Sequence, residues 1–116
     1  MAIITYEEFE RVELRSGIIT KAEVFDRARK PAYKIWADFG YEVGVIQTAA
    51  KITENYTLES LIGKRIVGCV NLKEKNIFGF ISQFLLIGFS DKAGAISLVT
   101  IDGKILDGEC VTSPAI

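Results

Sequence analysis

The stretch VELRSGIITKAEVF, residues 12–25, alternates apolar and polar side chains for several residues. Alternation with a period of two is the pattern of a β-strand that buries one face. Gly17 interrupts the pattern, and we expect a bulge or a sharp bend there. The stretch therefore predicts one long, curved strand, the kind of element from which small closed barrels are built.

Further strand patterns follow along the chain. Residues 33–40 alternate, and residues 43–48 follow closely enough for the two to form a hairpin. Asp102-Gly103 has the sequence of a two-residue type I′ turn. In the strand predicted over residues 33–40, the core face is expected to hold Tyr33, Ile35, Ala37 and Phe39. Three more strand patterns cover residues 65–72, 77–89 and 95–101.

A short helix is predicted at the N-terminus. Thr5 and Glu8 have the spacing of a capping box, in which each residue satisfies a backbone group of the other. Tyr6 and Phe9, three residues apart, would form the apolar face of this helix. That face must pack either on its own domain or on a partner subunit.

A second short helix is predicted between the third and fourth strands, where Thr57 caps LESLI, residues 58–62, and Gly63 ends it. Five strands, a helix at this place and glycines at the bends favour an all-β, five-stranded OB-fold barrel. Closure would protect the strand edges that an open sheet exposes. From the pattern alone, an SH3-like barrel or a small sandwich remains an alternative.

Length and composition are those of one globular domain over residues 1–116. Hydrophobic residues make up 49% of the chain and charged residues 25%. No apolar run approaches the roughly 20 residues that span a bilayer, so no membrane insertion is expected. The N-terminus MAIITYEEFE has no basic segment of the kind that opens a secretory signal. We expect a cytoplasmic protein.

The residue types present exclude many catalytic sites. The chain has no histidine, which removes Ser-His-Asp and Cys-His catalysis and most zinc hydrolase sites. No glycine-rich phosphate-binding motif occurs. The two cysteines, Cys69 and Cys110, are not clustered as in a disulfide framework or a metal site. We therefore expect no enzyme, no cofactor and no metal, and we interpret Cys69 as an unreactive core residue.

Two basic segments stand out against a net charge of −1. Residues 27–34 include Arg29 and Lys30 and contain no acid, whereas residues 64–75 contain Lys64, Arg65, Lys73 and Lys75 against the single acid Glu74. In an OB-fold RARKPA (27–32) and KEKN (73–76) would be the loops that flank the usual oligonucleotide-binding face. Clustered Lys and Arg provide affinity for phosphates. The alternative is that both are ordinary solvent-exposed loops.

Aromatic rings are a second sign of nucleic-acid binding, because bases stack on exposed rings. Most of the aromatic residues here alternate with polar residues as core positions do, so we interpret most of them as packed in the barrel. Trp36 is the exception, since it shares a strand face with polar residues. The candidates are Tyr33, Trp36, Tyr41, Phe78, Phe80 and Phe84.

The order of the motifs resembles a known family. FERVELRSGIITKAEVF (9–25) resembles the opening F-x-x-V-D-[IL]-R-[TV]-G-x-I-x-x-A-E of the tRNA-binding domains, which are OB-folds appended to bacterial methionyl-tRNA synthetases or free-standing. VNLKEKNIFGFISQFLLIG (70–88) resembles their V-N-[LF]-x-x-[RK]-x-[IM]-x-G-x-x-S-E segment. The middle of the chain, residues 38–71, is similar to the CsaA branch of export-related chaperones.

The resemblance implies a set of binding residues. The lysines would neutralise phosphates, and the Asn, Ser and Gln side chains would form hydrogen bonds to sugars or base edges. Gln83 stands where the family usually has Glu. The residues assigned by the resemblance are Arg15, Gln47, Asn71, Lys73, Lys75, Ser82 and Gln83, to which the basic loop adds Arg29 and Lys30.

The resemblance also implies partners. CsaA-type members are homodimers in which the N-terminal helix and the C-terminal segment, here CVTSPAI (110–116), help to form the contact. Two hypotheses follow: a non-enzymatic homodimer that binds tRNA or structured RNA, or a CsaA-like chaperone that binds unfolded or pre-export polypeptides in an apolar groove. In either case we interpret residues 78–87 as barrel wall, with Ser82-Gln83 as a polar notch at the binding face.

Overall fold

The computed structural model describes residues 1–111 of the chain, so the last five residues of the predicted domain and of the predicted C-terminal contact lie outside the described residues. The described residues form three short helices and nine strands. In order they are α1 (Tyr6–Glu10), β1 (Leu14–Val24), β2 (Tyr33–Asp38), α2 (Gly40–Val43), β3 (Val45–Ala50), α3 (Leu58–Leu61), β4 (Arg65–Cys69), β5 (Lys75–Ile77), β6 (Phe80–Ser82), β7 (Leu85–Leu86), β8 (Gly88–Ser90) and β9 (Ile96–Leu98).

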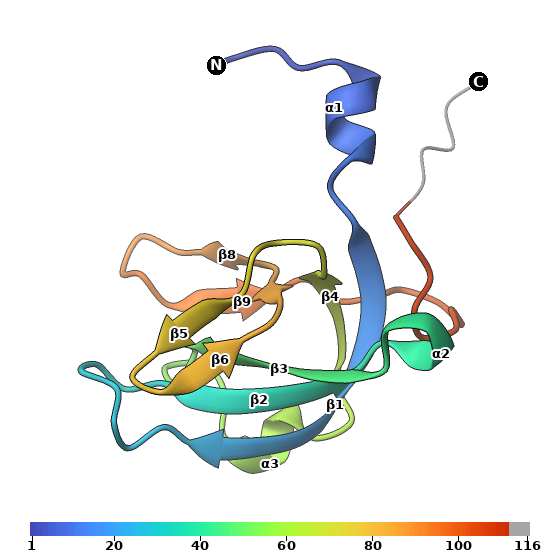
Figure 1. The fold of residues 1–116 in the computed structure, drawn as a ribbon. Helices are drawn as coiled ribbons and strands as arrows, with labels where there is room; N and C mark the ends of the chain where they lie inside the picture. The colour runs from blue at the N-terminus through green and yellow to red at the C-terminus, as the bar shows by residue number, and fades with distance from the viewer. Residues whose placement is uncertain (112–116) are drawn as a thin grey trace.

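The strands form a nearly closed antiparallel barrel (Figure 1). The main sheet has the order β3-β2-β1-β4-β7, and β5-β6 and β8-β9 are separate hairpins. β1 is long enough to pair with β4 along its first half and with β2 along its second half. It therefore holds the two halves of the barrel together, as the predicted long, curved strand should.

The bend in β1 is not where the sequence predicted it. The register against β2 shifts between Ile19 and Lys21, so the bulge falls beside Thr20 rather than at Gly17. Gly17 has another role, because a Cβ atom there would lie 2.8 Å from the ring of Phe39. A side chain at position 17 would displace this ring from the core.

The core lies inside the barrel, and the alternation predicted for β2 is confirmed. Ile35, Ala37 and Phe39 are fully buried. The rings of Phe39 and Phe84 pack edge to face with centroids 4.9 Å apart, a favoured geometry for aromatic pairs. The buried cluster consists of Ile19, Ile35, Ala37, Phe39, Ile52, Leu61, Ile66 and Phe84. Cys69 is also buried, as predicted.

Both predicted helix starts are confirmed. Thr5 and Glu8 form a capping box at α1, and Thr57 forms one with Ser60 at α3. The predicted β2–β3 hairpin is present, but its connection contains the one-turn helix α2, which the sequence did not predict. Among the described residues, no helix is both long enough and apolar enough to cross a membrane.

The strand pattern after β4 is more broken than predicted. Residues 77–89 do not form one strand but contribute to β5, β6, β7 and β8, because the chain turns repeatedly as it passes from hairpin to barrel wall. Asp102-Gly103 does not connect two strands, since β9 ends at Leu98 and no described strand follows it. The two-residue turn lies instead at Phe78-Gly79, between Ile77 and its partner Phe80.

Candidate nucleic-acid interface

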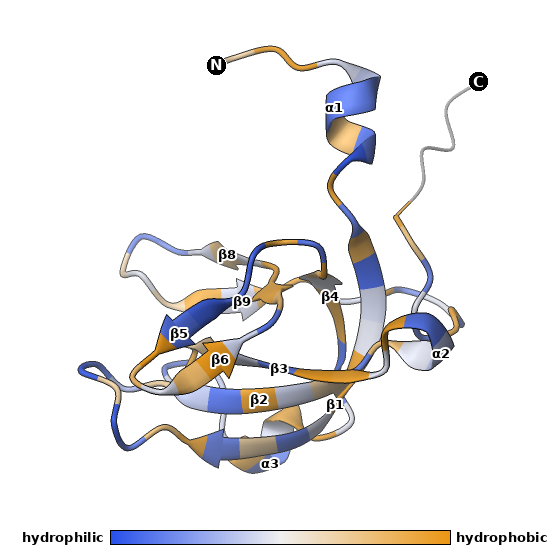
Figure 2. Cartoon of the chain, viewed as in Figure 1, coloured by the Kyte–Doolittle hydropathy of each residue, from blue (hydrophilic) through white to orange (hydrophobic). Residues whose placement is uncertain are grey.

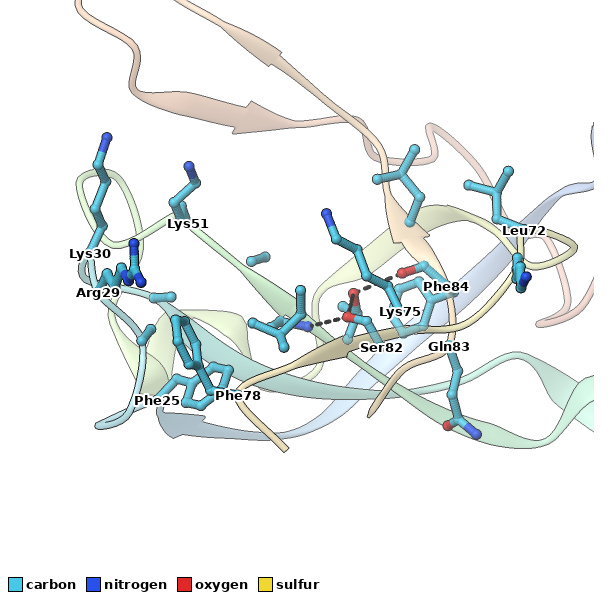
Figure 3. Close-up of a pocket in the computed structure, with 18 residues that line it drawn as sticks. Phe25, Arg29, Lys30, Lys51, Leu72, Lys75, Phe78, Ser82, Gln83 and Phe84 are labelled. Carbon is cyan, nitrogen blue, oxygen red and sulfur yellow. Dashed lines mark hydrogen bonds between the residues drawn. The ribbon is translucent and has the colours of Figure 1, made fainter. Parts of the chain in front are cut away.

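A groove of about 520 Å³ opens between the β5–β6 hairpin on one side and the β1–β2 loop and the end of β3 on the other (Figure 3). We call it the basic groove. Its volume is in the range of about 300–1,000 Å³ that is usual for binding clefts. Its walls are largely apolar, with Phe84 from the core cluster at its base.

Among the described residues, five cationic side chains and no carboxylate line the basic groove. All five are exposed, and none forms an ion pair within the part of the chain that the structure describes. In Figure 3 the amino groups of Lys30, Lys51 and Lys75 point to the same side of the groove. Unneutralised like charges around one hollow favour an anionic ligand. The five residues are Arg29, Lys30, Lys51, Lys73 and Lys75.

The fold brings the two basic loops together although more than 40 residues separate them. Figure 2 shows the hydrophilic β1–β2 loop and β5 at the same end of the molecule. Arg65 lies elsewhere, where its guanidinium donates to the carbonyl of Gly103 at 2.9 Å. Neither Lys64 nor Arg65, the other two cations of the second basic segment, lines the groove.

Ser82 lies in the groove wall, but its hydroxyl is used by the fold. The backbone N–H of Ala49 donates to Ser82 Oγ at 2.9 Å, and Thr48 Oγ1 lies 3.0 Å from the same atom. The Thr48 hydroxyl donates its only proton to the carbonyl of Phe84 at 2.7 Å. Ser82 is therefore the donor in the hydrogen bond between the Ser82 and Thr48 hydroxyls. Ser82 has no proton left to donate to a ligand.

Gln47 and Gln83 also use their hydrogen-bonding groups within the fold, where they join two parts of the barrel. The backbone N–H of Gln83 donates to the carbonyl of Gln47 at 2.7 Å, and the N–H of Gln47 donates to Oε1 of Gln83 at 3.2 Å. The side chain of Gln47 donates to the carbonyl of Ile81 and accepts from the indole of Trp36. In Figure 3 the Gln83 side chain points away from the lysine amino groups. The predicted polar notch, Ser82-Gln83, is thus a row of hydrogen bonds, or seam, between β3 and the end of β6.

Arg15 lies outside the basic groove. Its guanidinium contacts the carboxylates of Glu13 and Glu42 at 3.0 and 3.2 Å and the carbonyl of Gly108 at 3.1 Å. The hydrogen bond to Glu13 raises the pKa of the Arg15 guanidinium, so Arg15 stays charged at any pH at which the fold persists. With its side chain 12% exposed, Arg15 joins β1 to α2 and to the backbone at Gly108.

Asn71 also lies outside the basic groove, and its side chain forms hydrogen bonds within the fold. Its amide accepts from the backbone N–H of Glu13 at 2.9 Å and donates to the carbonyl of Arg11 at 2.6 Å. Both bonds fix the chain between α1 and β1 against the end of β4. Arg15, Gln47 and Asn71 thus do not line the groove together with the other six predicted residues, which are Arg29, Lys30, Lys73, Lys75, Ser82 and Gln83.

Phe78 is not barrel wall, which corrects the prediction for residues 78–87. It occupies the tip of the β5–β6 hairpin with a φ of 49° and is 45% exposed. The guanidinium of Arg29, from the opposite loop, lies over its ring at 5.8 Å from the centroid, within the range of a cation–π contact. Phe78 is therefore an exposed ring at the rim of the basic groove.

Lys51 was not among the binding residues predicted from the sequence. This residue directly follows β3 and reaches the groove beside Lys30. Its sequence signal was weak, because a single lysine after an apolar strand is ordinary. Only the placement of the end of β3 against the β1–β2 loop makes Lys51 the fifth cation of the groove.

Residues 14–109 match a family model described as "Putative tRNA binding domain". The chain belongs to this family. The match includes every strand described above and all five cations of the basic groove. The resemblance proposed from the sequence motifs is thereby confirmed.

Solved structures agree with the family assignment and confirm the OB-fold class. The crystal structure of the chaperone CsaA from Bacillus anthracis matches with a TM-score of 0.90 and 38% identity, over 96% of this chain and 100% of that chain. The CsaA chaperone protein from Picrophilus torridus matches with a TM-score of 0.88 and 38% identity, over 95% of this chain and 100% of that one.

Curated relatives include much longer proteins. The methionine–tRNA ligase of Thermotoga maritima is 35% identical over 109 residues, which are 94% of this chain but only 17% of that protein. The present chain therefore corresponds to a small part of the ligase. A MetRS-related protein from Pyrococcus horikoshii, in contrast, is matched over its whole length with 29% identity and a TM-score of 0.84.

Proposed function

We propose that this tRNA-binding-domain protein is non-enzymatic and binds tRNA or another structured RNA across the basic groove. The observation that carries the proposal is the meeting of five cations from three separate segments around a hollow that no carboxylate of residues 1–111 lines. Such a cluster attracts phosphates although the whole chain has a net charge of −1. Membership of the family and the likeness to parts of methionine–tRNA ligases support RNA as the ligand.

The residue roles follow from the geometry. Lys73 and Lys75, in and just before β5, and Arg29 and Lys30, in the β1–β2 loop, line the same groove, so an RNA backbone that follows the groove would meet positive charge from both segments. The hydrogen bonds of Ser82 and Gln83 fix the groove wall that carries Lys73 and Lys75 against β3. We therefore assign phosphate contact to the cations and a structural role to the two polar residues.

We further propose that the protein is a homodimer that uses α1. Tyr6 is 72% exposed and Phe9 is 41% exposed, and α1 stands away from the barrel (Figure 1). Beside it the N–H of Val111 donates to the carbonyl of Leu14 at 2.7 Å. A second copy would cover this apolar surface, which the described chain leaves uncovered. Two basic grooves on one particle would raise the avidity for RNA.

A second candidate function is the binding of unfolded polypeptides, as in a chaperone. One observation favours it: the basic groove is continuous with a second hollow under β8 and β9 that shares Lys30, Ala50 and Leu85 with it. An extended apolar surface of this kind can hold a largely unfolded chain. The likeness to two CsaA chaperones agrees with this candidate.

A tRNA titration tests the proposed function. Because Lys73 and Lys75 meet phosphates in this proposal, the double variant Lys73→Glu/Lys75→Glu should bind unfractionated tRNA at least about tenfold more weakly than the unmodified protein at low salt. The matched control is Lys64→Glu/Lys104→Glu, which changes the net charge equally at residues that do not line the groove. Equal tRNA affinity in the unmodified protein and the groove variant would contradict the proposal.

A further inference from the structure

The hairpin tip carries an aromatic residue in a backbone conformation that disfavours it. Phe78 has a φ of 49° and Gly79 a φ of 89°, the left-handed values of a type I′ turn. The first position of such a turn usually holds Asn, Asp or Gly, and a bulky residue there is an outlier. The turn is otherwise well formed, since Asn76 Oδ1 accepts from the N–H of Gly79 at 2.7 Å.

The core does not account for this strain. The Phe78 ring is 45% exposed, and it forms none of the aromatic pairs found among residues 1–111. Its neighbour Phe80, in contrast, packs edge to face on Phe25 and Trp36. Strained residues that the fold does not need occur mainly at ligand-binding sites.

The surroundings of the ring define the chemistry of a ligand. Phe78 lines the basic groove, and Arg29 approaches its ring from the opposite loop (Figure 3). Lys30, Lys51 and Lys75 line the same groove. A flat ring surrounded by unpaired cations is the arrangement in which proteins stack a nucleobase and neutralise the phosphates on either side of it.

We infer that Phe78 stacks on an unpaired base of the bound RNA, and that the basic groove holds a single-stranded segment rather than a duplex. The inference rests on the proposed function and adds the kind of RNA segment bound. A duplex keeps the faces of its bases stacked on one another, whereas a loop or a free end can offer a face to the ring. The strain at Phe78 is thus explained by the presentation of the ring at the hairpin tip.

One substitution separates stacking from folding. Phe78→Asn creates the Asn-Gly sequence that type I′ turns prefer, so its melting temperature should equal or exceed that of the unmodified protein. It nevertheless removes the ring. Phe78→Tyr restores a ring at the same place. The matched control is Phe89→Asn, which removes an exposed ring, 74% accessible, from β8 outside the groove.

The experiment measures fluorescence anisotropy with a labelled single-stranded RNA of about ten nucleotides and with a blunt duplex of the same sequence. Phe78→Asn should weaken single-strand binding by about fivefold or more and leave duplex binding unchanged. Phe78→Tyr and Phe89→Asn should bind as the unmodified protein does. A second ring-free variant, Phe78→Gly, should repeat the Phe78→Asn result, since glycine also accepts the turn.

The outcomes separate this inference from the proposed function. Unchanged single-strand binding by Phe78→Asn would overturn the inference, and so would an equal loss for strand and duplex. If the unmodified protein binds RNA and Lys73→Glu/Lys75→Glu does not, the proposed function stands whatever Phe78→Asn shows. Binding of an unfolded polypeptide but of no RNA, with Phe78 required, would contradict both.

Discussion

The Oγ1 atom of Thr48 lies 3.0 Å from the Oγ atom of Ser82, and this contact joins β3 to β6 where the barrel closes. Thr48 is 3% exposed and also donates to the carbonyl of Phe84. The two hydroxyls and the N–H of Ala49 thus form one chain of hydrogen bonds. These hydrogen bonds hold one wall of the basic groove in place, because Ser82 pairs with Lys75 in the β5–β6 hairpin.

The first prediction concerns that seam. Thr48→Val keeps the shape of the side chain but removes the hydroxyl, which leaves the buried carbonyl of Phe84 without this donor. We expect the free energy of unfolding to fall by about 1–3 kcal/mol, measured by urea denaturation. An unchanged free energy of unfolding would show that the seam does not hold the barrel closed.

The second prediction concerns the packing of Phe39. A Cβ atom at Gly68 would lie 2.6 Å from the Phe39 ring and 2.9 Å from the Phe84 ring. Both rings are buried, so neither moves freely. Gly68→Ala should destabilise the fold by about 1–3 kcal/mol through overpacking. A urea midpoint equal to that of the unmodified protein would contradict this packing.

The third prediction separates Arg15 from RNA binding. Arg15→Gln removes the ion pairs with Glu13 and Glu42, whose side chains are 43% and 73% exposed and therefore partly screened by solvent. We expect a loss of about 1–2 kcal/mol in stability and an unchanged affinity for tRNA. Arg11→Gln, which removes a charge from an exposed residue, is the control. A tenfold loss of tRNA affinity in Arg15→Gln, with stability intact, would contradict this prediction and show that Arg15 contacts the RNA.

The fourth prediction tests the dimer. Tyr6→Ser/Phe9→Ser removes the apolar face of α1, so the proposed dimer should dissociate to a monomer in light scattering. Tyr41→Ser, which removes a fully exposed ring from α2, should leave the mass unchanged. A double variant that remains dimeric, or an unmodified protein that is monomeric, would contradict the role of α1.

Features set by neighbouring residues could be predicted from the sequence. The capping boxes at α1 and α3 involve residues three apart, and the alternation in β2 needs only the period of a strand. The division of residues 77–89 could not be predicted, because each turn depends on how the barrel closes. Asp102-Gly103 failed as a turn signal for a related reason, since a type I′ turn also needs a strand to pair with.

The candidate site, like the fold, has features that the sequence could predict and features that it could not. The convergence of the β1–β2 loop with the segment around Lys73 follows from the expected OB-fold and was predicted. The partners of the polar residues were not, because Ser82 bonds to Ala49 and Arg15 to Gly108 across long stretches of sequence. The resemblance pointed to these polar positions, and only the structure shows that their hydrogen bonds hold the fold together.

The central claim is that the basic groove binds RNA through its charges, and the salt dependence of tRNA binding tests it most directly. If all five cations meet phosphates of a single-stranded segment, a plot of log affinity against log salt concentration should have a slope of about −3.5. The slope should be shallower by about 1.4 in Lys73→Glu/Lys75→Glu, which removes two of these contacts. A slope near zero in the unmodified protein, or the same slope in both proteins, would contradict the account.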